Sequence, residues 1–592
     1  MQYAWKCYVG LRISMQVNLR CRSVKWIFLS WLPFSMGTQA HAQLPLLEWT
    51  RQWGGNVNEH NGGMDILPNG DIITLVTAWP QCTFDPSGSS PVVTSLGGSD
   101  LLMVRFDTLG AVVWTRTMGG PGYDYGNAID INTYGDVFIT GFIAGTADMD
   151  PSAQSLLVSS DGEFDYDIVV GKYDASGAVQ WAFGLGGGGP GDDSGNGVAA
   201  TVDGGVLVTG AFFEPMDCDP GPAVAMIYSH GEADIFVAKY SDVGAFEWAF
   251  ALGGPETDEA FSIDTDANGN AYITGWHRLD ADFDPGPDDY VLDYSCSRAF
   301  LASYDPSGAF RWAFQFGAGC QSRGICVRTG KPDGVFVTGS FAFTTDMDPG
   351  PGVHELNAAT GSVFLAKYDV FGNYQWARNY GSGVTYDPGY TIDLDRHGNV
   401  YTAGHFQGSM DGDTSADTCM LSALGYTDIF VSAFDPTGSW LWSGSVAGAQ
   451  GYERVPSIRI QRDAIYLSGQ FNYSADMDLG TDSAFCDLDP YRDIFLCRYV
   501  QAAPTSVSEM ATVSNDLLLF PNPTAANILV QAPAELLGGR IRVMDALGRQ
   551  YYDQVLSAER ITVELDALPV GLYIVACSKG LWSSSVRLVV ER

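Results

Sequence analysis

Residues 234–275 read DIFVAKYSDVGAFEWAFALGGPETDEAFSIDTDANGNAYITG, a run of four short segments rich in β-forming residues. Alternation and composition predict strands at Asp234–Tyr240, Ala245–Leu252, Ala260–Asp264 and Asn270–Gly275. Turns rich in Gly, Asn and Asp join the segments, and Gly supplies the positive φ that such turns need. The stretch has no apolar repeat at 3.6-residue spacing, so we expect no helix in it.

The same pattern occurs seven times along the chain, and the tryptophan of the second segment marks each copy. The copies follow one another at intervals of 65, 67, 67, 64, 64 and 66 residues. The marking residues are Trp49, Trp114, Trp181, Trp248, Trp312, Trp376 and Trp442. A fixed period of this length indicates a repeat architecture. Four strands in each copy are typical of the blades of a β-propeller.

The two ends of the repeat region complement each other. The first copy begins at the tryptophan strand, Leu47–Trp53, and the last copy stops at Asp493–Tyr499 with no tryptophan strand after it. Pairing these two segments closes a ring and leaves no exposed sheet edge, which removes an aggregation hazard. An open solenoid is the alternative, and it would leave both half-copies unpaired. We therefore predict an all-β chain in which residues 43–500 form a seven-bladed β-propeller closed by its N- and C-terminal strands.

The turns of the repeat resemble a known repeat family. A G-G-x-x-x-D-x-G/A start occurs at Gly119–Gly126, and a D-x-x-G-N-x-Y-x-T-G hairpin occurs at Asp266–Gly275. Both resemble the seven-bladed propeller repeat of bacterial surface proteins, over roughly residues 47–500. The resemblance implies the propeller fold and says little about function.

The N-terminal segment has the features of a secretory signal peptide. Residues 1–42 hold five basic residues and no acidic one, and the apolar run Trp26–Met36 precedes the sequence Ala40-His41-Ala42. This order predicts cleavage before Gln43. The apolar run is too short to span a bilayer, so we expect no transmembrane segment after cleavage. Met1 and Met15 are both candidate start residues.

The C-terminal part is predicted to be a separate small domain. A polar linker, residues 501–515, precedes residues 516–592, whose alternation predicts a β-sandwich of about seven short strands. Its motif residues are Pro521, Asn522, Pro523, Asp545, Gly548, Arg549, Gly571 and Tyr573. This order of motifs resembles the C-terminal sorting domain of the type IX secretion system of Bacteroidetes. The resemblance implies that the secretion machinery is a partner and that the protein becomes secreted or displayed on the cell surface. An ordinary immunoglobulin-like terminal module is the alternative.

The net charge of the chain excludes some classes of binding partner. The chain has 31 basic and 69 acidic residues, and without residues 1–42 it has 26 basic residues and a net charge of −43. Such a surface repels nucleic acid and anionic lipid. We therefore expect no nucleic-acid partner. The charge suits a soluble extracellular protein that collects cations.

The cysteines do not recur with the repeat. Nine of the eleven lie outside residues 1–42, in a compartment that permits disulfides. Cys320 and Cys326 are a candidate disulfide pair, with Cys296 as a competitor, whereas Cys497 and Cys577 lie in apolar segments and are predicted to be buried thiols. No C-x-x-C spacing occurs, so we expect no structural zinc.

Paired carboxylates in the loop after the fourth segment are the strongest candidates for a site. They are Asp148, Asp150, Asp217, Asp219, Asp282, Asp284, Asp346, Asp348, Asp411, Asp413, Asp476 and Asp478. The loop after the tryptophan strand should emerge on the same face, and it adds Glu59, Asp124, Asp192, Asp193, Asp258 and Glu259. Calcium takes several oxygen ligands at once, so this crown of carboxylates is a candidate calcium site and calcium is the one candidate cofactor. Turn capping by Asp is the main alternative, and direct ligand recognition is a third.

Two other patterns have structural interpretations. Asp264–Gly269 spells the start of a calcium loop, but the twelfth position is Gly275 instead of Glu, so we predict a hairpin turn. Exposed tryptophans could stack on sugars, yet the fixed place of the repeated tryptophans favours packing between blades. Trp53 and Trp440 fall outside the repeat register and are the better candidates for exposure.

Enzyme signatures are weak. The chain has no G-x-S-x-G, H-E-x-x-H or P-loop motif, and Ser303–Gly308 has one residue too many for a sialidase Asp box.

We therefore predict a non-catalytic binding or adhesion propeller that is exported by the type IX system and binds an extracellular glycan or protein. The alternative is a carbohydrate-active hydrolase or lyase acting in the funnel, because a carboxylate pair could be present among so many acids. A structural module without a ligand is a third possibility. The loops differ most at Arg323–Asp333 and Gly408–Leu424.

Overall fold

The computed structural model describes residues 44–590 with short gaps. The gaps are 55–58, 81, 84–91, 161–164, 188–190, 214, 293–295, 317–320, 331–333, 382–386, 416–417, 449–453, 463, 481–482, 502–516, 521–523, 525–526, 533–536, 546–548, 559, 566–567 and 580–581. The predicted signal peptide and nearly all of the predicted linker lie outside the described residues. The described elements are all strands, which confirms the all-β prediction. The described residues contain no helix that is long and apolar enough to cross a membrane.

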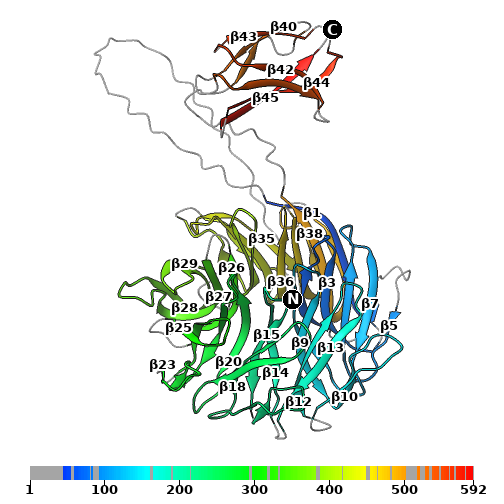
Figure 1. Cartoon of the computed structure of the whole chain (residues 1–592), viewed down its shortest axis with the longest axis vertical. Helices are drawn as coiled ribbons and strands as arrows, with labels where there is room; N and C mark the ends of the chain where they lie inside the picture. The colour runs from blue at the N-terminus through cyan, green and yellow to red at the C-terminus, as the bar shows by residue number, and fades with distance from the viewer. Residues whose placement is uncertain are drawn as a thin grey trace, which may run out of the picture. The chain divides into compact units, whose positions relative to one another are not determined.

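Among the described residues, the strands of the repeat region form five separate four-stranded sheets and one eight-stranded sheet (Figure 1). The eight-stranded sheet divides into two further sets of four, which are joined by a short pairing at Ala447 and Gly448. In hydrogen-bonded order, the first four sets are β2 (His60–Ile66), β3 (Ile72–Ala78), β6 (Asp100–Phe106) and β7 (Val112–Met118); β8 (Tyr125–Ile131), β9 (Val137–Ala144), β12 (Tyr166–Tyr173) and β13 (Val179–Leu185); β14 (Ser194–Ala200), β15 (Val206–Phe212), β18 (Asp234–Tyr240) and β19 (Phe246–Leu252); and β20 (Glu259–Thr265), β21 (Ala271–His277), β24 (Arg298–Tyr304) and β25 (Phe310–Gln315).

The other three sets continue the series. They are β26 (Arg323–Gly330), β27 (Gly334–Asp346), β28 (Glu355–Asp369) and β29 (Tyr374–Tyr380); β30 (Gly389–Leu394), β31 (Val400–Phe406), β34 (Asp428–Phe434) and β35 (Trp440–Gly448); and β36 (Arg454–Gln461), β37 (Ala464–Asp476), β38 (Phe485–Val500) and β1 (Leu46–Trp53). The four predicted strands of residues 234–275 are β18 to β21, so each sequence copy is divided between two neighbouring sheets.

Short two-stranded ribbons extend five of the copies. They are β4 (Cys82–Thr83) with β5 (Val92–Val93), β10 (Thr146–Asp148) with β11 (Leu157–Ser159), β16 (Met216–Asp217) with β17 (Met226–Ile227), β22 (Ala281–Asp282) with β23 (Val291–Leu292), and β32 (Ser409–Asp411) with β33 (Met420–Ser422). In the two other copies the same pairing is the distal part of β27–β28 and of β37–β38.

The first strands of the seven sets contact one another in cyclic order. β2 contacts β8, and the series continues through β14, β20, β26, β30 and β36 back to β2. Apolar side chains fill the space between neighbouring sheets, as in the buried cluster that joins Ile235 and Val237 to Ile273 and Phe300. The core is therefore distributed between the sheets instead of lying within one of them.

The chain ends pair as predicted. β1 runs antiparallel to β38, with Leu47 opposite Tyr499 and Trp53 opposite Ile494 (Figure 1). The prediction that Trp53 is exposed is wrong, because only 1% of it is accessible. Its ring packs against that of Phe106 at 5.1 Å between centroids, in the apolar layer between the last sheet and the first. Trp440 is half-buried and donates its Nε1 hydrogen to Ser443 Oγ.

Six of the seven repeated tryptophans pack against a turn of the following sheet. Trp181 Nε1 donates to the carbonyl of Asp242 at 3.0 Å, in the turn between β18 and β19. Gly244 of that turn has φ +77, and a Cβ on it would lie 2.9 Å from the Trp181 ring. The same bond joins Trp49 to Thr108, Trp114 to Ala175, Trp248 to Pro306, Trp312 to Val370 and Trp376 to Pro436. The interpretation of these tryptophans as packing residues is confirmed.

The cysteines differ in part from the prediction. Cys497 and Cys577 are free and buried, as predicted. Cys326 is also free, so the predicted Cys320–Cys326 disulfide is wrong, and Cys296 is the disulfide-bonded cysteine among the described residues. β26 places the Cys326 side chain in an apolar cluster between sheets.

The C-terminal domain contains seven strands among its described residues. β39 (Leu518–Phe520), β40 (Asn527–Gln531) and β43 (Arg560–Glu564) form one sheet, and β42 (Gln550–Val555), β41 (Arg540–Asp545), β44 (Gly571–Lys579) and β45 (Trp582–Val590) form the other. Ile528 and Val530 of the first sheet share one buried cluster with Val543 and Val575 of the second. The domain is therefore a small β-sandwich, as predicted.

Closure of the repeat region can be tested on β1. We expect Trp53→Ala to lower the free energy of unfolding by about 3–5 kcal/mol, because it removes a fully buried aromatic from the layer between the last and first sheets. Leu46→Ala is the control on the same strand, since Leu46 is 50% exposed, and it should change stability by only about 0.5 kcal/mol. Urea unfolding of residues 43–592 measures both. Equal effects of the two variants would contradict the role of β1.

Candidate functional site

The paired carboxylates cap their own loops. Asp282 Oδ1 accepts the N–H groups of Asp284 at 3.0 Å and Tyr290 at 2.8 Å, and Asp284 Oδ1 accepts the N–H of Gly286. The five other pairs, which begin at Asp148, Asp217, Asp346, Asp411 and Asp476, make the same three bonds. Such bonds from an Asp to nearby backbone N–H groups define an Asx turn. They support the turn-capping alternative.

The two predicted loop families meet, but most of the second family is buried. The main chains of Asp282 and Gly253 exchange hydrogen bonds of 3.0 and 3.2 Å, which joins a carboxylate loop to the loop after a tryptophan strand. The expected crown is wrong for Glu59, Asp124, Asp193 and Asp258, which are buried, whereas Asp192 is exposed. The described residues contain no group of three or more His, Cys, Asp or Glu that could hold a metal ion. Calcium at the paired carboxylates stays a prediction.

Buried carboxylates face each other between neighbouring sheets. Asp258 accepts the N–H groups of Gly254 at 2.8 Å and Arg278 at 2.7 Å, and Asp234 lies beside it at the start of β18. A Cβ on Gly253 would lie 2.3 Å from Asp234 Oδ1 and 2.9 Å from Asp258 Oδ2, so both carboxylates approach one backbone position. Both residues are fully buried.

Burial raises the pKa values of these carboxyl groups. The pKa of Asp258 is raised to about 8, by desolvation and by the charge of Asp234, against backbone hydrogen bonds that lower it. Desolvation raises the pKa of Asp234 to about 6. The matching pair Asp124 and Asp100 reaches about 7 and about 6 for the same reason. Each pair therefore favours one protonated member near neutral pH.

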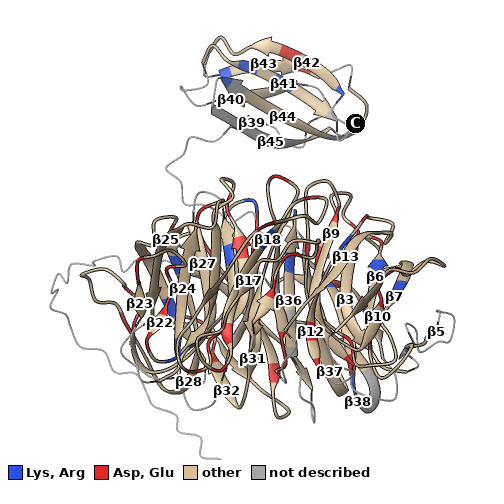
Figure 2. Cartoon of the chain, turned by 60° about the horizontal axis from the view of Figure 1, so that its bottom comes forward, with Lys and Arg blue, Asp and Glu red and all other residues tan. Residues whose placement is uncertain are grey.

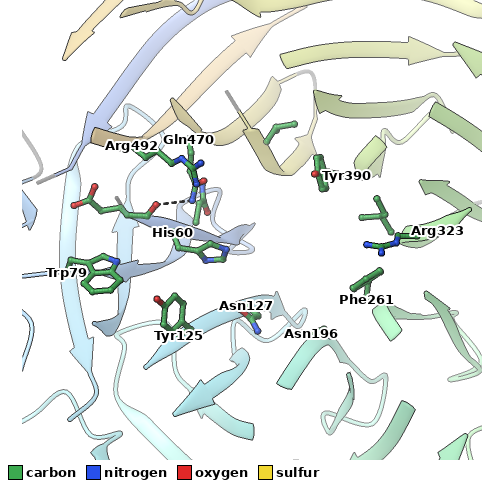
Figure 3. A pocket seen from close by; sticks show the side chains of 14 residues that line it. His60, Trp79, Tyr125, Asn127, Asn196, Phe261, Arg323, Tyr390, Gln470 and Arg492 are labelled. Atoms are coloured by element: carbon green, nitrogen blue, oxygen red, sulfur yellow. Dashed lines mark hydrogen bonds between the residues drawn. The ribbon is translucent and has the colours of Figure 1, made fainter. Parts of the chain in front are cut away.

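A cavity of about 630 Å³ lies at the first strands of the sheets (Figure 3). This size is within the range of small-molecule sites. Its lining contains four aromatic side chains, two arginines and several amides. The lining residues are Glu59, His60, Asn61, Trp79, Tyr125, Asn127, Asn196, Phe261, Arg323, Ile325, Tyr390, Val455, Gln470 and Arg492. All seven first strands contribute to it or flank it, so the cavity exists only when the sheets come together.

β-bulges in several first strands supply part of this lining. The pairing of β8 with β9 skips Asn127, and the pairing of β20 with β21 skips Phe261. Asn196, Ile325 and Tyr390 are skipped in the same way. A bulge leaves one residue unpaired and re-aims its side chain. All five bulge residues line the cavity.

Of the cavity residues, only Glu59 was among the predicted crown carboxylates, although the sequence contains a signal for others. The bulge position reads Asn, Asn, Phe, Ile and Tyr in successive copies, between a Gly or Ala on one side and a small residue, Ala, Gly, Ser, Cys or Thr, on the other. A set of equivalent binding positions around a ring would show this pattern, in which one position varies while the residues on either side stay small. Arg323 begins the segment that was predicted to be most irregular.

Polar side chains connect neighbouring strands around the cavity. Asn127 Nδ2 donates to the Gly195 carbonyl, and Asn196 Nδ2 donates to Glu259 Oε1 and to the Ala260 carbonyl, all at 3.1 Å. Burial raises the pKa of Glu259, while hydrogen bonds from Trp276 and Asn196 and the Arg323 charge oppose this. Tyr125 stacks on Phe142 with 4.8 Å between ring centroids. The lining is therefore held in place before any ligand arrives.

A ring of charged residues lies deeper along the same strands. Asp65, Asp130, Asp264 and Asp393 each accept a backbone N–H from the next first strand, at 2.5–2.7 Å. Arg328 and Arg459 occupy the equivalent positions in two sheets, and Arg459 pairs with Asp65 at 3.0 Å. The second cavity, of about 130 Å³, is lined by both arginines. These contacts join strand edges that have no partner in their own sheet.

The sorting-domain motifs are partly described. Pro521, Asn522, Pro523 and Gly548 lie outside the described residues, whereas Asp545 ends β41, Arg549 precedes β42, and Gly571 and Tyr573 lie in β44. Tyr573 Oη donates to the Pro569 carbonyl at 2.9 Å, which closes the turn before β44.

Comparison with known families identifies the C-terminal domain. Residues 518–591 match the model described as secretion system C-terminal sorting domain. The type IX sorting domain predicted from the motifs is therefore confirmed. It indicates export by that system, interaction with the secretion machinery and a secreted or cell-surface location.

Known proteins similar to the chain say less about the repeat region. An uncharacterized WD repeat-containing protein of Acanthamoeba polyphaga mimivirus is 26% identical over 265 residues, which cover 38% of this chain and 19% of the relative. The chain thus spans about a fifth of that relative's length. A Bacteroides caccae protein of unknown function aligns with TM-score 0.28, 9% identity, 59% of this chain and 91% of its own. PorZ, a surface component of the type IX system of Porphyromonas gingivalis, aligns with TM-score 0.13, 10% identity, 92% of this chain and 100% of its own. At these TM-scores neither structure supports an argument.

The turn-capping role can be separated from a calcium role by two substitutions at one position. We expect Asp282→Ala to lower the free energy of unfolding by about 1–2 kcal/mol in the presence of chelator, because two backbone N–H groups lose their acceptor. Asp282→Asn keeps an acceptor oxygen and should lose less than half of that. Asp289→Ala, an exposed residue of the same loop, is the control. Calcium-dependent melting that both Asp282 variants abolish equally would contradict capping and support the calcium prediction.

The buried carboxylate pairs predict an unusual pH dependence. A carboxyl whose folded pKa is raised stabilises the fold when protonated, and this stability is lost as pH rises through the folded pKa. With pKa values raised from 3.8 to about 8 for Asp258 and about 7 for Asp124, the melting temperature should rise as pH falls from about 8 to about 4. Asp258→Asn should flatten this slope, whereas the turn variant Asp305→Asn should leave it unchanged. A melting temperature that stays constant or falls over this window would refute the assignment.

Proposed function

We propose that this chain is a secreted or cell-surface, non-catalytic binding protein whose central cavity takes an extracellular glycan. In this proposal residues 43–500 are a seven-bladed β-propeller closed by the terminal strands, residues 501–515 are a linker, and residues 516–592 direct export. Residues 1–42 are the signal peptide that brings the chain to the periplasm.

Several observations support the propeller. The seven sets of four strands contact one another in cyclic order through their first strands, and β1 pairs with β38. The similarity to a WD repeat-containing protein agrees with this architecture, because WD repeats are propeller blades. Ligand sites are concave surfaces at which several elements converge, and the 630 Å³ cavity has this character.

The composition of the cavity supports a glycan ligand. Sugar rings have an apolar face of C–H groups and a periphery of hydroxyl groups. Phe261, Tyr390 and Tyr125 supply aromatic surface from three different sheets, and Asn127 and Gln470 supply amides that can donate and accept hydrogen bonds. The convergence of bulge side chains from separate sheets on one cavity is the observation that carries the proposal.

A protein ligand is less favoured at this place. Peptides are commonly recognised by pairing their main chain with an exposed strand edge. The first strands have their N–H groups at Ile131, Ala200 and Thr329 already bound by Asp65, Asp130 and Asp264. These backbone N–H groups are therefore already hydrogen-bonded and do not pair with a peptide main chain.

Aromatic substitutions in the cavity test the proposal. Binding of the mature chain is measured first on a panel of plant, algal and bacterial polysaccharides and then by calorimetry with the best one. We expect Phe261→Ala and Tyr390→Ala each to weaken binding by about tenfold or more, since buried aromatic contacts dominate such sites. Phe371→Ala removes an aromatic that is 70% exposed on an outer turn, and it should leave binding unchanged.

Two results would contradict the proposal. One is polysaccharide binding that survives both cavity substitutions while their melting temperatures equal that of the parent chain. The other is shortening of the bound polysaccharide during incubation, which would support the hydrolase or lyase alternative instead.

A further inference from the structure

Arg323 is a charged side chain in the cavity wall, close enough to Glu259 for its charge to lower the pKa of that carboxyl. It begins β26, is exposed, and lines the cavity. Its guanidinium carbon lies 5.3 Å from the ring centroid of Trp276. Within the described part of the chain, no hydrogen bond or ion pair engages this guanidinium. Other arginines of the repeat region, such as Arg51 and Arg378, donate to turn carbonyls.

Trp276 holds Arg323 in a defined place. A guanidinium over an indole face is attracted by the ring quadrupole. The indole is itself fixed, because its Nε1 donates to Glu259 Oε2 at 3.2 Å and only 8% of the residue is exposed. The Arg323 side chain therefore contacts the indole and also lines the cavity. A guanidinium binds a planar anion through two parallel hydrogen bonds.

The charge of the surroundings makes this position distinctive. The chain has a net charge of −38, and acidic residues are spread through the strands and loops of the repeat region (Figure 2). The cavity lining nevertheless has two arginines, Arg323 and Arg492, against one carboxylate, Glu59, which is buried. Figure 3 shows the two arginines on different sides of the cavity.

Phe261 supplies an aromatic face next to the guanidinium of Arg323. It is the bulge residue of the neighbouring first strand, and Figure 3 shows it beside Arg323. An aromatic face next to a guanidinium edge matches a sugar ring that carries a carboxylate on its rim. A uronic acid has this arrangement, since its ring stacks through C–H groups while its carboxylate projects from the edge.

We propose that the cavity recognises an acidic glycan, with the Arg323 guanidinium binding the carboxylate of a uronic acid residue that stacks on Phe261. This inference rests on the proposed glycan-binding function and adds the class of sugar. Arg323 acts as a binding residue, and the selectivity for acidic over neutral sugar comes from it.

The experiment compares one glycan in two charge states. Calorimetry of the mature chain uses oligogalacturonate and its carboxyl-reduced form, which has the same linkages without the charge. We expect the acidic form to bind at least about tenfold more tightly, because a charge-assisted bidentate pair contributes this much. Arg323→Met keeps the apolar stem and should remove the difference, whereas Arg323→Lys should restore part of it. Arg278→Met is the matched control, because Arg278 stacks on the same indole but does not line the cavity.

The outcomes separate this inference from the proposed function. Equal affinity for the acidic and reduced forms, with Phe261→Ala still weakening both, would overturn the uronate subsite and leave the glycan-binding proposal standing. A preference for the acidic form that persists in Arg323→Met would likewise overturn it. Tighter binding of poly-glutamate than of oligogalacturonate, again lost in Arg323→Met, would overturn both in favour of an acidic peptide.

Discussion

The contact between a tryptophan and the turn of the next sheet is the interaction on which the repeat region depends. Trp181 Nε1 donates to the Asp242 carbonyl, and Gly244 leaves room for the indole to lie against the turn. One sheet cannot form this contact alone, because the indole and the turn belong to different sheets. The last sheet has no tryptophan strand of its own after β38, so β1 must supply it. Trp49 on that strand then joins the last sheet to the first through Thr108.

Part of the acidic composition has a structural use inside the fold. Carboxylates cap the ribbon loops, as at Asp282, and they join first strands to one another, as at Asp130. Others, such as Asp234 and Asp258, are buried between sheets with raised pKa values. Each of these uses satisfies backbone N–H groups that a sheet edge or a loop would leave without an acceptor. A high negative charge therefore does not by itself indicate a cation-binding surface.

Within a first strand, the residues that hold the sheets together differ from the residue that lines the cavity. The Gly or Ala and the small residue on either side of each bulge keep the first strands close together, and the bulge residue between them is free to differ. Asn127 and Asn196 form hydrogen bonds to the next first strand, whereas Phe261, Ile325 and Tyr390 line the cavity with apolar surface. A repeat protein can thus change its ligand without changing the contacts that hold the sheets together.

The sequence by itself determined the strands, the repeat and the pairing of the chain ends, because alternation, turn residues and a fixed period are local signals. It also determined the sorting domain, whose motifs lie close together near the C-terminus. Only the tertiary structure decided the cavity, since its residues lie in seven copies and meet only when the first strands converge. It likewise decided that Trp53 and Asp258 are buried and that Cys326 is free, because burial depends on the neighbouring sheet and not on the segment that carries the residue.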